Sequence, residues 1–504
     1  MEYTVIQLLW SSASVLFMYY LIDLLSIRKH TGHPLIGNSW KIAPRLKLNF
    51  DFFWDGTRLL QEGYQKARIR HVQYKSGTFQ LVRNQGNIVI LPASLLEELS
   101  VLPSNVASPH GALEHDLLGS YTGLNLILES RIHHSIVQRK LTPRLSLLTP
   151  ALEAELRFAL QESFPKLQHD NWAEFQPYQI FGKISARLTA LFRTIVILRI
   201  LPQWVHPLVS VLLPSFWRGR HYLQQGKDVL EPKIRELIQE DHTSTPDSFD
   251  PETSNVLYWL TESAKGADRD PDTIAHIEVL LALASVHTTL LRMVNVLYDI
   301  TASGHDLVEE LRDEVQTVFN SEAAWANPGS YDRLYKLDSV LRESQRMSPP
   351  TTLGMKRLFK EDFTFSSGLH MSKGTYVCMP IFAIENDPAN TSNPEQFDGL
   401  RNYRARCSVQ VNKRGDASAD GKEYLFSSPG KTVLNFGYGK SACPGRFFAS
   451  LIIKMLFVKL LTEYDFQFLP GRGRPSNLMA HEFLFSWPWE KMVVRRRGKT
   501  VPVP

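Results

Sequence analysis

Apolar runs alternate with polar, turn-rich segments along this chain, and one run in its second half predicts a long buried helix. Residues 267–304 are apolar on most faces, which is typical of a helix surrounded by protein. Asp270 or Asp272 can cap the start of this helix. Pro271 suits its first turn, and Gly304 can end it. About 30 residues at 1.5 Å per residue reach ~45 Å, so the helix should cross a whole domain.

The same patterning predicts further helices and a little sheet. Residues 332–349 read as a second helix, which Pro349 stops. Residues 443–464 read as a third helix that starts near a cysteine. Residues 362–380 alternate and contain Ser-Gly and Lys-Gly turns, which indicates short strands, whereas residues 381–430 are expected to be irregular. The predicted fold class is therefore mainly α with a small β component.

The N-terminal segment has the length and composition of a membrane anchor. Residues 5–27 are predominantly apolar and would reach ~34 Å as a helix, enough to cross a bilayer. Arg28 and Lys29 follow this segment, and the positive-inside rule then places the rest of the chain in the cytosol. The charge order is the reverse of that in a cleaved signal peptide. The alternative is a buried core helix.

These features predict three parts of the chain. Residues 1–28 form a transmembrane signal-anchor, and residues 29–48 form a linker that contains proline and glycine. Residues 49–504 form one large domain, which the resemblance described below implies is the catalytic one.

Composition narrows the classes of partner and compartment. The net charge is +5, but lysine and arginine are spread through the chain, so we expect no nucleic-acid partner. A basic face toward a membrane or an acidic protein fits better. The three cysteines, Cys378, Cys407 and Cys443, favour a reducing compartment and do not make a disulfide framework or a structural zinc site.

Cys443 stands in a loop that is rich in glycine and precedes a helix. Taken alone, a cysteine before an apolar helix is most often a small buried hydrophobic residue. Gly437, Gly439 and Gly445, however, permit tight turns and the close approach of a flat object. A helix N-terminus also favours a thiolate, which suits either nucleophilic catalysis or metal ligation.

This loop carries a resemblance to a known family. The matching residues are Phe436, Gly437, Gly439, Cys443, Gly445 and Ala449. They are similar to the haem-binding loop of the cytochrome P-450 superfamily of haem-thiolate monooxygenases. The resemblance implies the cytochrome P-450 fold, haem b as cofactor and Cys443 as the axial thiolate ligand of the haem iron. Thiolate ligation favours cleavage of the O–O bond.

A second segment resembles the Glu-x-x-Arg helix of the same family. Glu343 and Arg346 are three residues apart, so both side chains lie on one helical face and can pair. Taken alone, such a pair is usually a solvated surface pair. Residues 393–404 resemble the meander that follows in the family, and Arg401 is the residue expected to complete the ion network. A network of this kind fixes geometry and does no chemistry itself.

A third segment, residues 284–289, resembles the oxygen-activating part of the long distal helix. Small residues here let the helix backbone approach the iron, and the hydroxyl of Thr288 can bond the carbonyl four residues back. The resemblance implies that Thr288 lies on the oxygen side, where proton delivery assists O–O scission. His287 stands where the family usually has an acid. It can relay protons, or it can be a core histidine bonded to backbone.

The resemblance also implies cations that bind the haem propionates. Arg357 matches the family arginine after the Glu-x-x-Arg helix, and Arg139 is a further candidate, with His133 or His134 nearby. Ser441 departs from the family, which usually has arginine or histidine at this position of the loop. A second departure is that residues 181–208 are about one helix short. This shortening is either a natural deletion or an error in the reading of the gene.

By resemblance, the chain is expected to use O2, with electrons from NADPH through cytochrome P-450 reductase, to oxidise a lipophilic small molecule. Lys440 and Arg446 are candidates for docking the reductase, and residues 205–217 for a cavity entrance that dips into the membrane. The pattern suggests fungal terpenoid or alkaloid biosynthesis at the endoplasmic reticulum membrane, on analogy alone. Two alternatives stay open. One is a haem-thiolate isomerase, desaturase or ring-forming enzyme, and the other is an inactive protein.

Overall fold

The computed structural model describes most of the predicted catalytic domain. Besides Met18, the described residues are 33–37, 45–69, 77–83, 86–123, 131–165, 171–182, 189–239, 255–412 and 421–498. The predicted membrane anchor at residues 5–27 lies outside these ranges, apart from Met18. Residues 34–36 of the predicted linker pair with Gln80 of the first strand, and Ile36 is buried there. This part of the linker range therefore belongs to the folded body.

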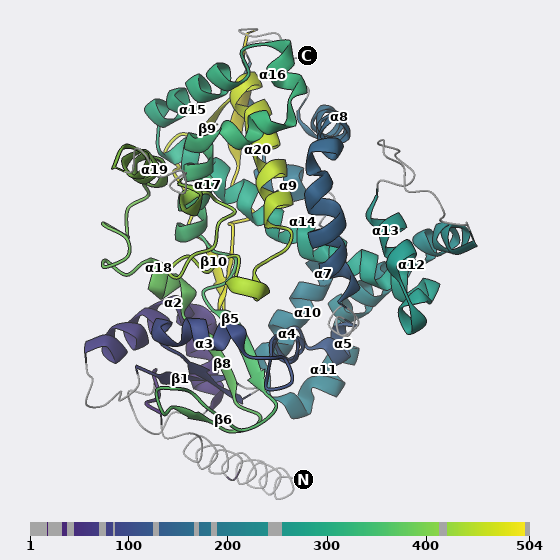
Figure 1. The fold of residues 1–504 in the computed structure, drawn as a ribbon, viewed down its shortest axis with the longest axis vertical. Helices are drawn as coiled ribbons and strands as arrows, with labels where there is room; N and C mark the ends of the chain where they lie inside the picture. Colours follow the sequence, from purple (N-terminus) through teal and green to yellow (C-terminus); the bar gives the residue numbers. More distant parts are fainter. Residues whose placement is uncertain are drawn as a thin grey trace, which may run out of the picture.

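A five-stranded sheet forms one end of the molecule, at the bottom of Figure 1. Its strand order is β1-β2-β8-β5-β3, with β2 and β8 parallel and the other neighbours antiparallel. Every residue of β1 and β8 is buried, because helix α2 (Arg45–Ile69) packs on this sheet. The strands are β1 (Phe79–Arg83), β2 (Gly86–Ile90), β3 (Ala107–Ser108), β5 (Gly354–Phe359) and β8 (Tyr376–Met379).

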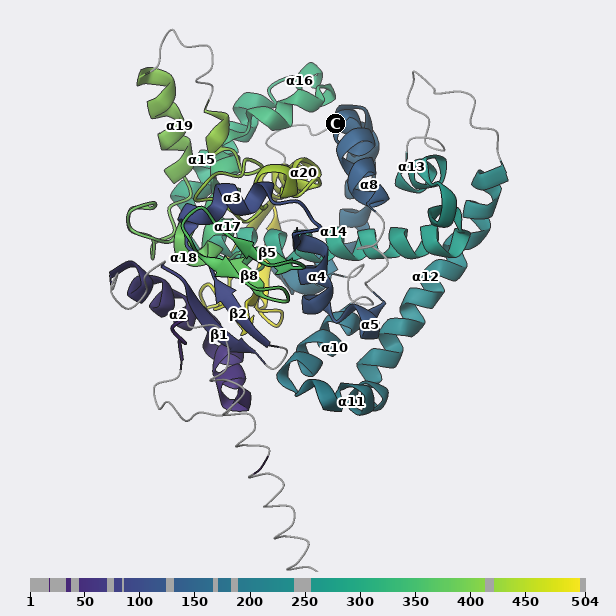
Figure 2. The ribbon, with the colours of Figure 1, turned by 60° about the horizontal axis from the view of Figure 1, so that its bottom comes forward.

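Helix α14 (Pro271–Ala302) crosses the middle of the protein, as the sequence predicts (Figure 2). The carboxylate of Asp270 caps its start by accepting the backbone N–H of Thr273 at 3.0 Å. Among the described helices, α14 alone is long and apolar enough to span a membrane by length and composition. Its packing shows it to be a core helix. It contacts α9 (Pro177–Gly182), α12 (Pro214–Gln239), α17 (Tyr335–Met347) and α20 (Arg446–Glu463).

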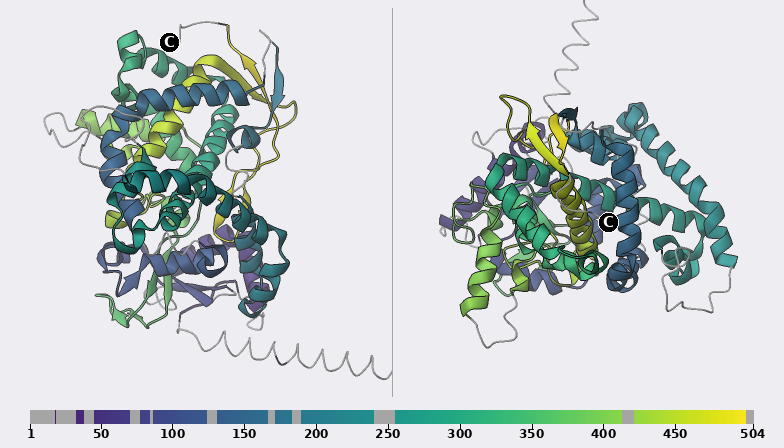
Figure 3. Two further views of the ribbon diagram at one scale, coloured as in Figure 1. Left: turned by 90° about the vertical axis from the view of Figure 1, so that its right-hand side faces the viewer. Right: turned by 90° about the horizontal axis from the view of Figure 1, so that it is seen from above.

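The helix-rich end holds the largest apolar core, which joins α14, α17, α20 and α15 (His305–Val318). Leu297, Val340 and Phe457 lie in this core. A three-stranded sheet packs beside it, as the left panel of Figure 3 shows at the top. That sheet has the order β4-β12-β9, formed by β4 (Ala173–Phe175), β12 (Met492–Arg496) and β9 (Tyr464–Phe468).

Shorter elements complete the fold and confirm a mainly helical protein with a small sheet component. A hairpin of β10 (Leu478–Ala480) and β11 (Phe483–Phe485) contacts α2. The predicted short strands of residues 362–380 are present, because β6 (Phe363–Thr364) and β7 (His370–Met371) precede β8. The other principal helices are α3 (Leu96–Val101), α4 (Pro109–Leu117), α5 (Gly119–Thr122), α7 (Ile132–Ile136), α8 (Leu145–Ser163), α10 (Thr189–Ile200), α11 (His206–Leu212), α13 (Val256–Ser263) and α16 (Glu322–Ala326).

The prediction that residues 381–430 are irregular is wrong in part. Helix α18 (Ile381–Glu385) and helix α19 (Arg401–Asn412) lie within this range. The residues of α19 are mostly polar and show no apolar stripe, so local patterning carries no helical signal. Tertiary contact supplies the support instead. The hydroxyl of Ser339 on α17 accepts the backbone N–H groups of Asn402 and Tyr403, each at 3.1 Å.

Candidate active site

The loop that holds Cys443 is closed on itself by a backbone hydrogen bond. The N–H of Cys443 donates to the carbonyl of Phe436 at 2.7 Å. Gly437 has φ +77°, and a Cβ at this position would lie 2.8 Å from the carbonyl oxygen of Ser441. Gly439 also has a positive φ, of +59°. These two positions therefore require glycine for backbone reasons, as the sequence indicates.

The sulfur of Cys443 lies just before α20. Cys443 is exposed, and α20 begins three residues later at Arg446. Burial by the rest of the loop raises the pKa of the Cys443 thiol. The backbone N–H groups of Gly445 and Arg446 bond toward the sulfur and act in the opposite direction. An exposed thiol with two aligned N–H donors suits a sulfur that binds a metal as thiolate.

Arg357 is a buried cation beside this loop. Its guanidinium donates from Nη2 to the hydroxyl of Ser441 at 3.0 Å and from Nη1 to the carbonyl of Lys356 at 2.9 Å. The side chain is 3% exposed, its Nε has no hydrogen-bond partner among the described residues, and burial lowers its pKa to about 10. A buried guanidinium without a carboxylate fits an anionic group such as a haem propionate. The site thus passes this test for haem.

His110 and Arg131 are two further ionisable residues in the neighbourhood of Arg357, and sequence reasoning missed both. Burial lowers the pKa of His110 on α4, and the charges of Arg131, His134, Arg357 and Lys360 lower it further. His134 was expected near a propionate, whereas His110 and Arg131 were not. The structure gives Arg139, the other candidate, an exposed side chain. His110 lies on a separate helix, α4, and the sequence around it contains no pattern that would place it near Arg357.

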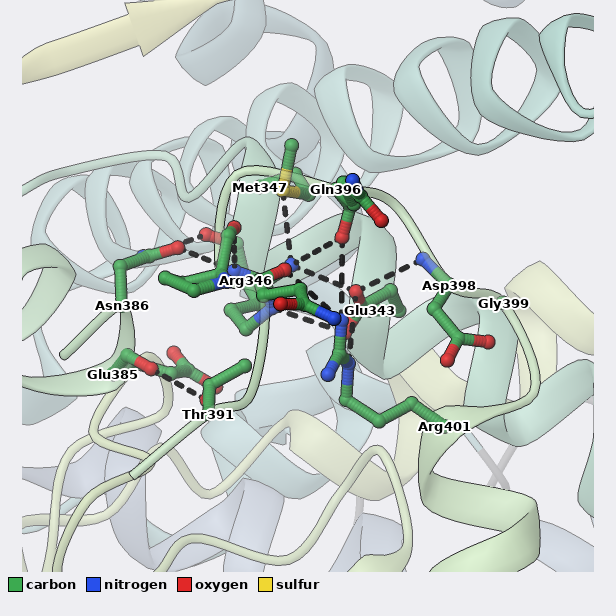
Figure 4. A network of polar contacts seen from close by, with 12 residues as sticks. Glu343, Arg346, Met347, Glu385, Asn386, Thr391, Gln396, Asp398, Gly399 and Arg401 are labelled. Atoms are coloured by element: carbon green, nitrogen blue, oxygen red, sulfur yellow. Dashed lines mark hydrogen bonds and ion pairs between the residues drawn. The ribbon is translucent and has the colours of Figure 1, made fainter. Parts of the chain in front are cut away.

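The structure brings Glu343, Arg346 and Arg401 together, as Figure 4 shows. Arg346 donates to both oxygens of Glu343, from Nη2 at 2.7 Å and from Nε at 3.0 Å. Arg401, the first residue of α19, donates from Nε to Glu343 at 3.2 Å. Glu343 is 0% exposed and Arg346 is 3% exposed, so the pair is a buried one.

The network also fastens the meander that precedes α19. Arg346 donates to the carbonyls of Pro394 and Gln396, at 2.6 and 3.1 Å, and to the side chain of Asn386. Arg401 donates to the carbonyl of Ser392. A network of this kind holds several chain segments in one fixed arrangement.

Thr288 and Ala284 are exposed in the middle of a helix that is otherwise largely buried. The hydroxyl of Thr288 donates to the carbonyl of Ala284 at 2.9 Å, which is the bond that the sequence predicts. His287 points elsewhere: it is buried, and its ring lies 6.2 Å from that of Phe485 on β11. Burial lowers the pKa of His287 to about 4, so its imidazole is neutral at physiological pH.

The region predicted to be short, residues 181–208, runs from the end of α9 through α10 to the start of α11. Helix α9 ends at Gly182 and α10 begins at Thr189, with residues 183–188 outside the described ranges. Helices α10 and α11 follow directly, and α11 carries several exposed apolar side chains, treated below.

The comparisons with known proteins give the family of the chain. The model of the family described as cytochrome P450 matches residues 181–494, more than half of the chain. The chain belongs to the cytochrome P450 family. It is 33% identical to a cytochrome P450 monooxygenase of Emericella nidulans, an alignment that covers 98% of this chain and 94% of the relative. This cytochrome P450 is therefore a monooxygenase of a family that binds haem through a cysteine thiolate.

Two other relatives of this cytochrome P450 have names of the same kind. A cytochrome P450 monooxygenase of Penicillium canescens is 31% identical, covering 96% of this chain and 92% of its own. An ent-kaurene oxidase of Gibberella fujikuroi is 29% identical, covering 95% of each chain. The Emericella alignment extends over 521 residues, more than the 504 of this chain, so that relative has residues without a counterpart here.

Proposed function

We propose that this chain is a haem b monooxygenase in which Cys443 is the axial ligand of the haem iron. The observation that carries the proposal is the Cys443 loop itself. Its sulfur is exposed at the start of α20, it receives two backbone N–H groups, and a buried guanidinium lies alongside. Bound haem supplies the oxygen activation, and the protein supplies binding and orientation.

The roles of the remaining residues follow from where their atoms lie. Arg357 binds a propionate, and Arg131 adds positive charge nearby, whereas burial and the charge of Arg131 lower the pKa of both His110 and His134 and favour their neutral forms. Thr288 holds its hydroxyl proton on the carbonyl of Ala284 and presents its oxygen on the exposed side of α14. The Thr288 hydroxyl can form a hydrogen bond with dioxygen that is bound in the site. His287 is a core histidine in this assignment, because it is buried and neutral.

A reduced carbon monoxide difference spectrum of the purified protein tests the proposal. The wild-type protein should give the Soret band that is typical of thiolate ligation, and Cys443→Ala should abolish it. Cys407→Ala is the matched control, because Cys407 is a free cysteine on α19. Retention of the thiolate band in Cys443→Ala, or its absence from wild type, overturns the assignment.

The substrate is a lipophilic small molecule, and we place the enzyme in fungal terpenoid or alkaloid biosynthesis. The support is that one relative is named an ent-kaurene oxidase. Electrons come from NADPH through cytochrome P450 reductase. Lys440 is exposed on the Cys443 loop, and Arg446 is positioned by its bond to the Cys443 carbonyl at 2.8 Å. Activity of the reconstituted pair should fall with rising salt if these cations dock an acidic partner.

We also propose that the protein is a single-pass protein of the endoplasmic reticulum membrane, with its catalytic domain in the cytosol. Residues 5–27 are the anchor. A set of exposed apolar side chains on and around α11 supports a second contact with the bilayer, because one tryptophan of the set is 72% exposed. The set is Trp204, Leu208, Val211, Leu212 and Trp217. Removal of residues 1–28 should release the protein from vesicles only when Trp204 and Leu208 are also changed to serine.

A further inference from the structure

Glu385 is a buried carboxylate that none of the assigned roles uses. It is the last residue of α18, it is 5% exposed, and it lies at the edge of the network in Figure 4. Its Oε2 accepts a hydrogen bond of 2.6 Å from Nδ2 of Asn435. Asn435 is the residue directly before the Cys443 loop. A side chain of the ion network region is thus bonded to the point where that loop begins.

Glu385 is connected to the backbone of Cys443 by two hydrogen bonds and the peptide bond that lies between them. Asn435 is followed by Phe436, and the Phe436 carbonyl accepts the Cys443 N–H at 2.7 Å. The ring of Phe436 packs on Phe426, with 5.1 Å between centroids. A shift of Asn435 therefore moves the residue whose carbonyl closes the loop.

Cations stand on the other side of Glu385. The ionised form of Glu385 is favoured by the positive charges of Arg342 and Arg346 on α17 and of Arg292 on α14. The negative charge of Glu343 disfavours that form. The neighbouring Asn386 accepts a hydrogen bond from Arg346. Burial outweighs these cations and raises the pKa of Glu385 to about 7. The carboxyl group can therefore gain or lose its proton near neutral pH.

We propose that Glu385 is a positioning residue that holds the start of the Cys443 loop through Asn435, and that loss of its negative charge loosens this hold. An ionised carboxylate is the stronger acceptor for the amide N–H of Asn435, so the neutral form binds Asn435 less firmly. The inference rests on the proposed function, because its readouts come from haem that is ligated by Cys443.

The experiment follows the ferric Soret position and the reduction midpoint potential of the purified holoprotein between pH 5.5 and 8.5. In wild type, both should change through one inflection near pH 7. Glu385→Gln should remove the inflection and keep the low-pH values throughout, because glutamine cannot ionise. Asn435→Ala should also remove it, although the carboxylate remains. Amide hydrogen exchange of residues 436–443 should be faster in both variants than in wild type at pH 8.

Glu314→Gln is the matched control. Glu314 on α15 is a half-buried carboxylate whose pKa is also raised by burial, and it accepts the N–H of Leu337 at 2.9 Å. This variant should keep the wild-type inflection. A wild-type titration without an inflection overturns the inference, as does an inflection that survives in Glu385→Gln or Asn435→Ala. If Glu385→Gln does not fold, the titrations of wild type and Asn435→Ala test the inference. A missing thiolate band in wild type overturns the proposed function instead.

Discussion

Arg357 and Ser441 are joined by a hydrogen bond of 3.0 Å from the guanidinium Nη2 to the hydroxyl oxygen. Ser441 stands two residues before Cys443, where the family usually has a charged residue. The serine adds no charge, but its hydroxyl fixes the direction of the one buried guanidinium on β5. An anionic group beside the loop therefore meets a cation whose direction is fixed. The departure from the family pattern changes how the cation is held and does not remove it.

Replacing Ser441 by alanine should weaken haem retention. The change removes one hydrogen bond from a buried charged group, a loss of about 1.5–3 kcal/mol when the group stays unpaired. Arg357→Leu should cost more, because it removes the cation itself. The haem-to-protein ratio after gel filtration and the thermal midpoint of the holoprotein measure both effects. Ser408→Ala is the control, because Ser408 bonds only a carbonyl on the exposed face of α19. Equal haem retention in Ser441→Ala and wild type would contradict this role.

Breaking the buried network should destabilise the protein far more than breaking a surface pair. Arg346→Leu leaves the buried Glu343 with Arg401 and the backbone N–H of Asp398 as partners, and the removal of one partner of a buried pair costs about 3–5 kcal/mol. Arg404 and Asp398 form an exposed pair in the same region, so Arg404→Ala should cost at most about 1 kcal/mol. Urea unfolding of the three proteins compares these free energies. A loss in Arg346→Leu no larger than that in Arg404→Ala would show that the network carries no stability.

The local pattern of the chain predicts the elements whose stability is local or strongly apolar. The long helix α14 has an apolar surface on most faces and an N-cap aspartate, and both are visible in the sequence. Helix α19 is invisible to the same reasoning, because its N–H groups at Asn402 and Tyr403 depend on Ser339, more than 60 residues earlier. Its support is tertiary, and no local propensity encodes it.

The candidate site divides in the same way. Cys443, Gly437 and the pair of Glu343 and Arg346 lie within short motifs whose spacing is itself the signal. His110 and Glu385 belong to the site through contacts with Arg357 and Asn435, which come from distant parts of the chain. No spacing relates them. Only folding brings them together, so a single sequence could not identify them.

Substitutions of Thr288 and of its neighbour His287 on α14 should have different effects on catalysis. Thr288→Ala removes the exposed hydroxyl, and product formation should fall by up to about 100-fold while NADPH consumption continues. His287→Gln should change coupling little, because the imidazole is buried and is neutral above its pKa of about 4. Thr301→Ala is the control, because Thr301 makes the same bond to a carbonyl four residues back on the same helix. Strong uncoupling in His287→Gln would contradict the role of a core histidine and support the alternative, in which His287 relays protons.

A second buried ion cluster fastens α10 to the β10–β11 turn. Arg199 on α10 donates from Nη2 to both oxygens of Glu482, at 3.1 and 2.9 Å, and Lys356 on β5 bonds the same carboxylate at 3.0 Å. Glu482 is 0% exposed, and the surrounding cations hold its pKa well below its ordinary value. Because α10 leads into α11, this contact fixes one end of the segment that we place at the membrane.

Glu482→Gln should therefore lower the free energy of unfolding by about 3–5 kcal/mol at pH 7, because Arg199 and Lys356 stay buried without this carboxylate. The depressed pKa gives the pH dependence. The stabilisation is full above the pKa of Glu482 in the unfolded chain, near 4.5, and is lost as the pH falls below that value. In this range the unfolded chain takes up a proton at Glu482 and the folded protein does not, so protonation favours unfolding. Denaturation at pH 3.5–8 should show a gap between wild type and Glu482→Gln that is constant above pH 5.5 and narrows below pH 4.5. Glu309→Gln, at a half-exposed pair with Arg312 in which Arg312 keeps Asp465 as a partner, should show almost no gap. A gap that stays the same down to pH 3.5 would mean that the charge of Glu482 does not hold α10.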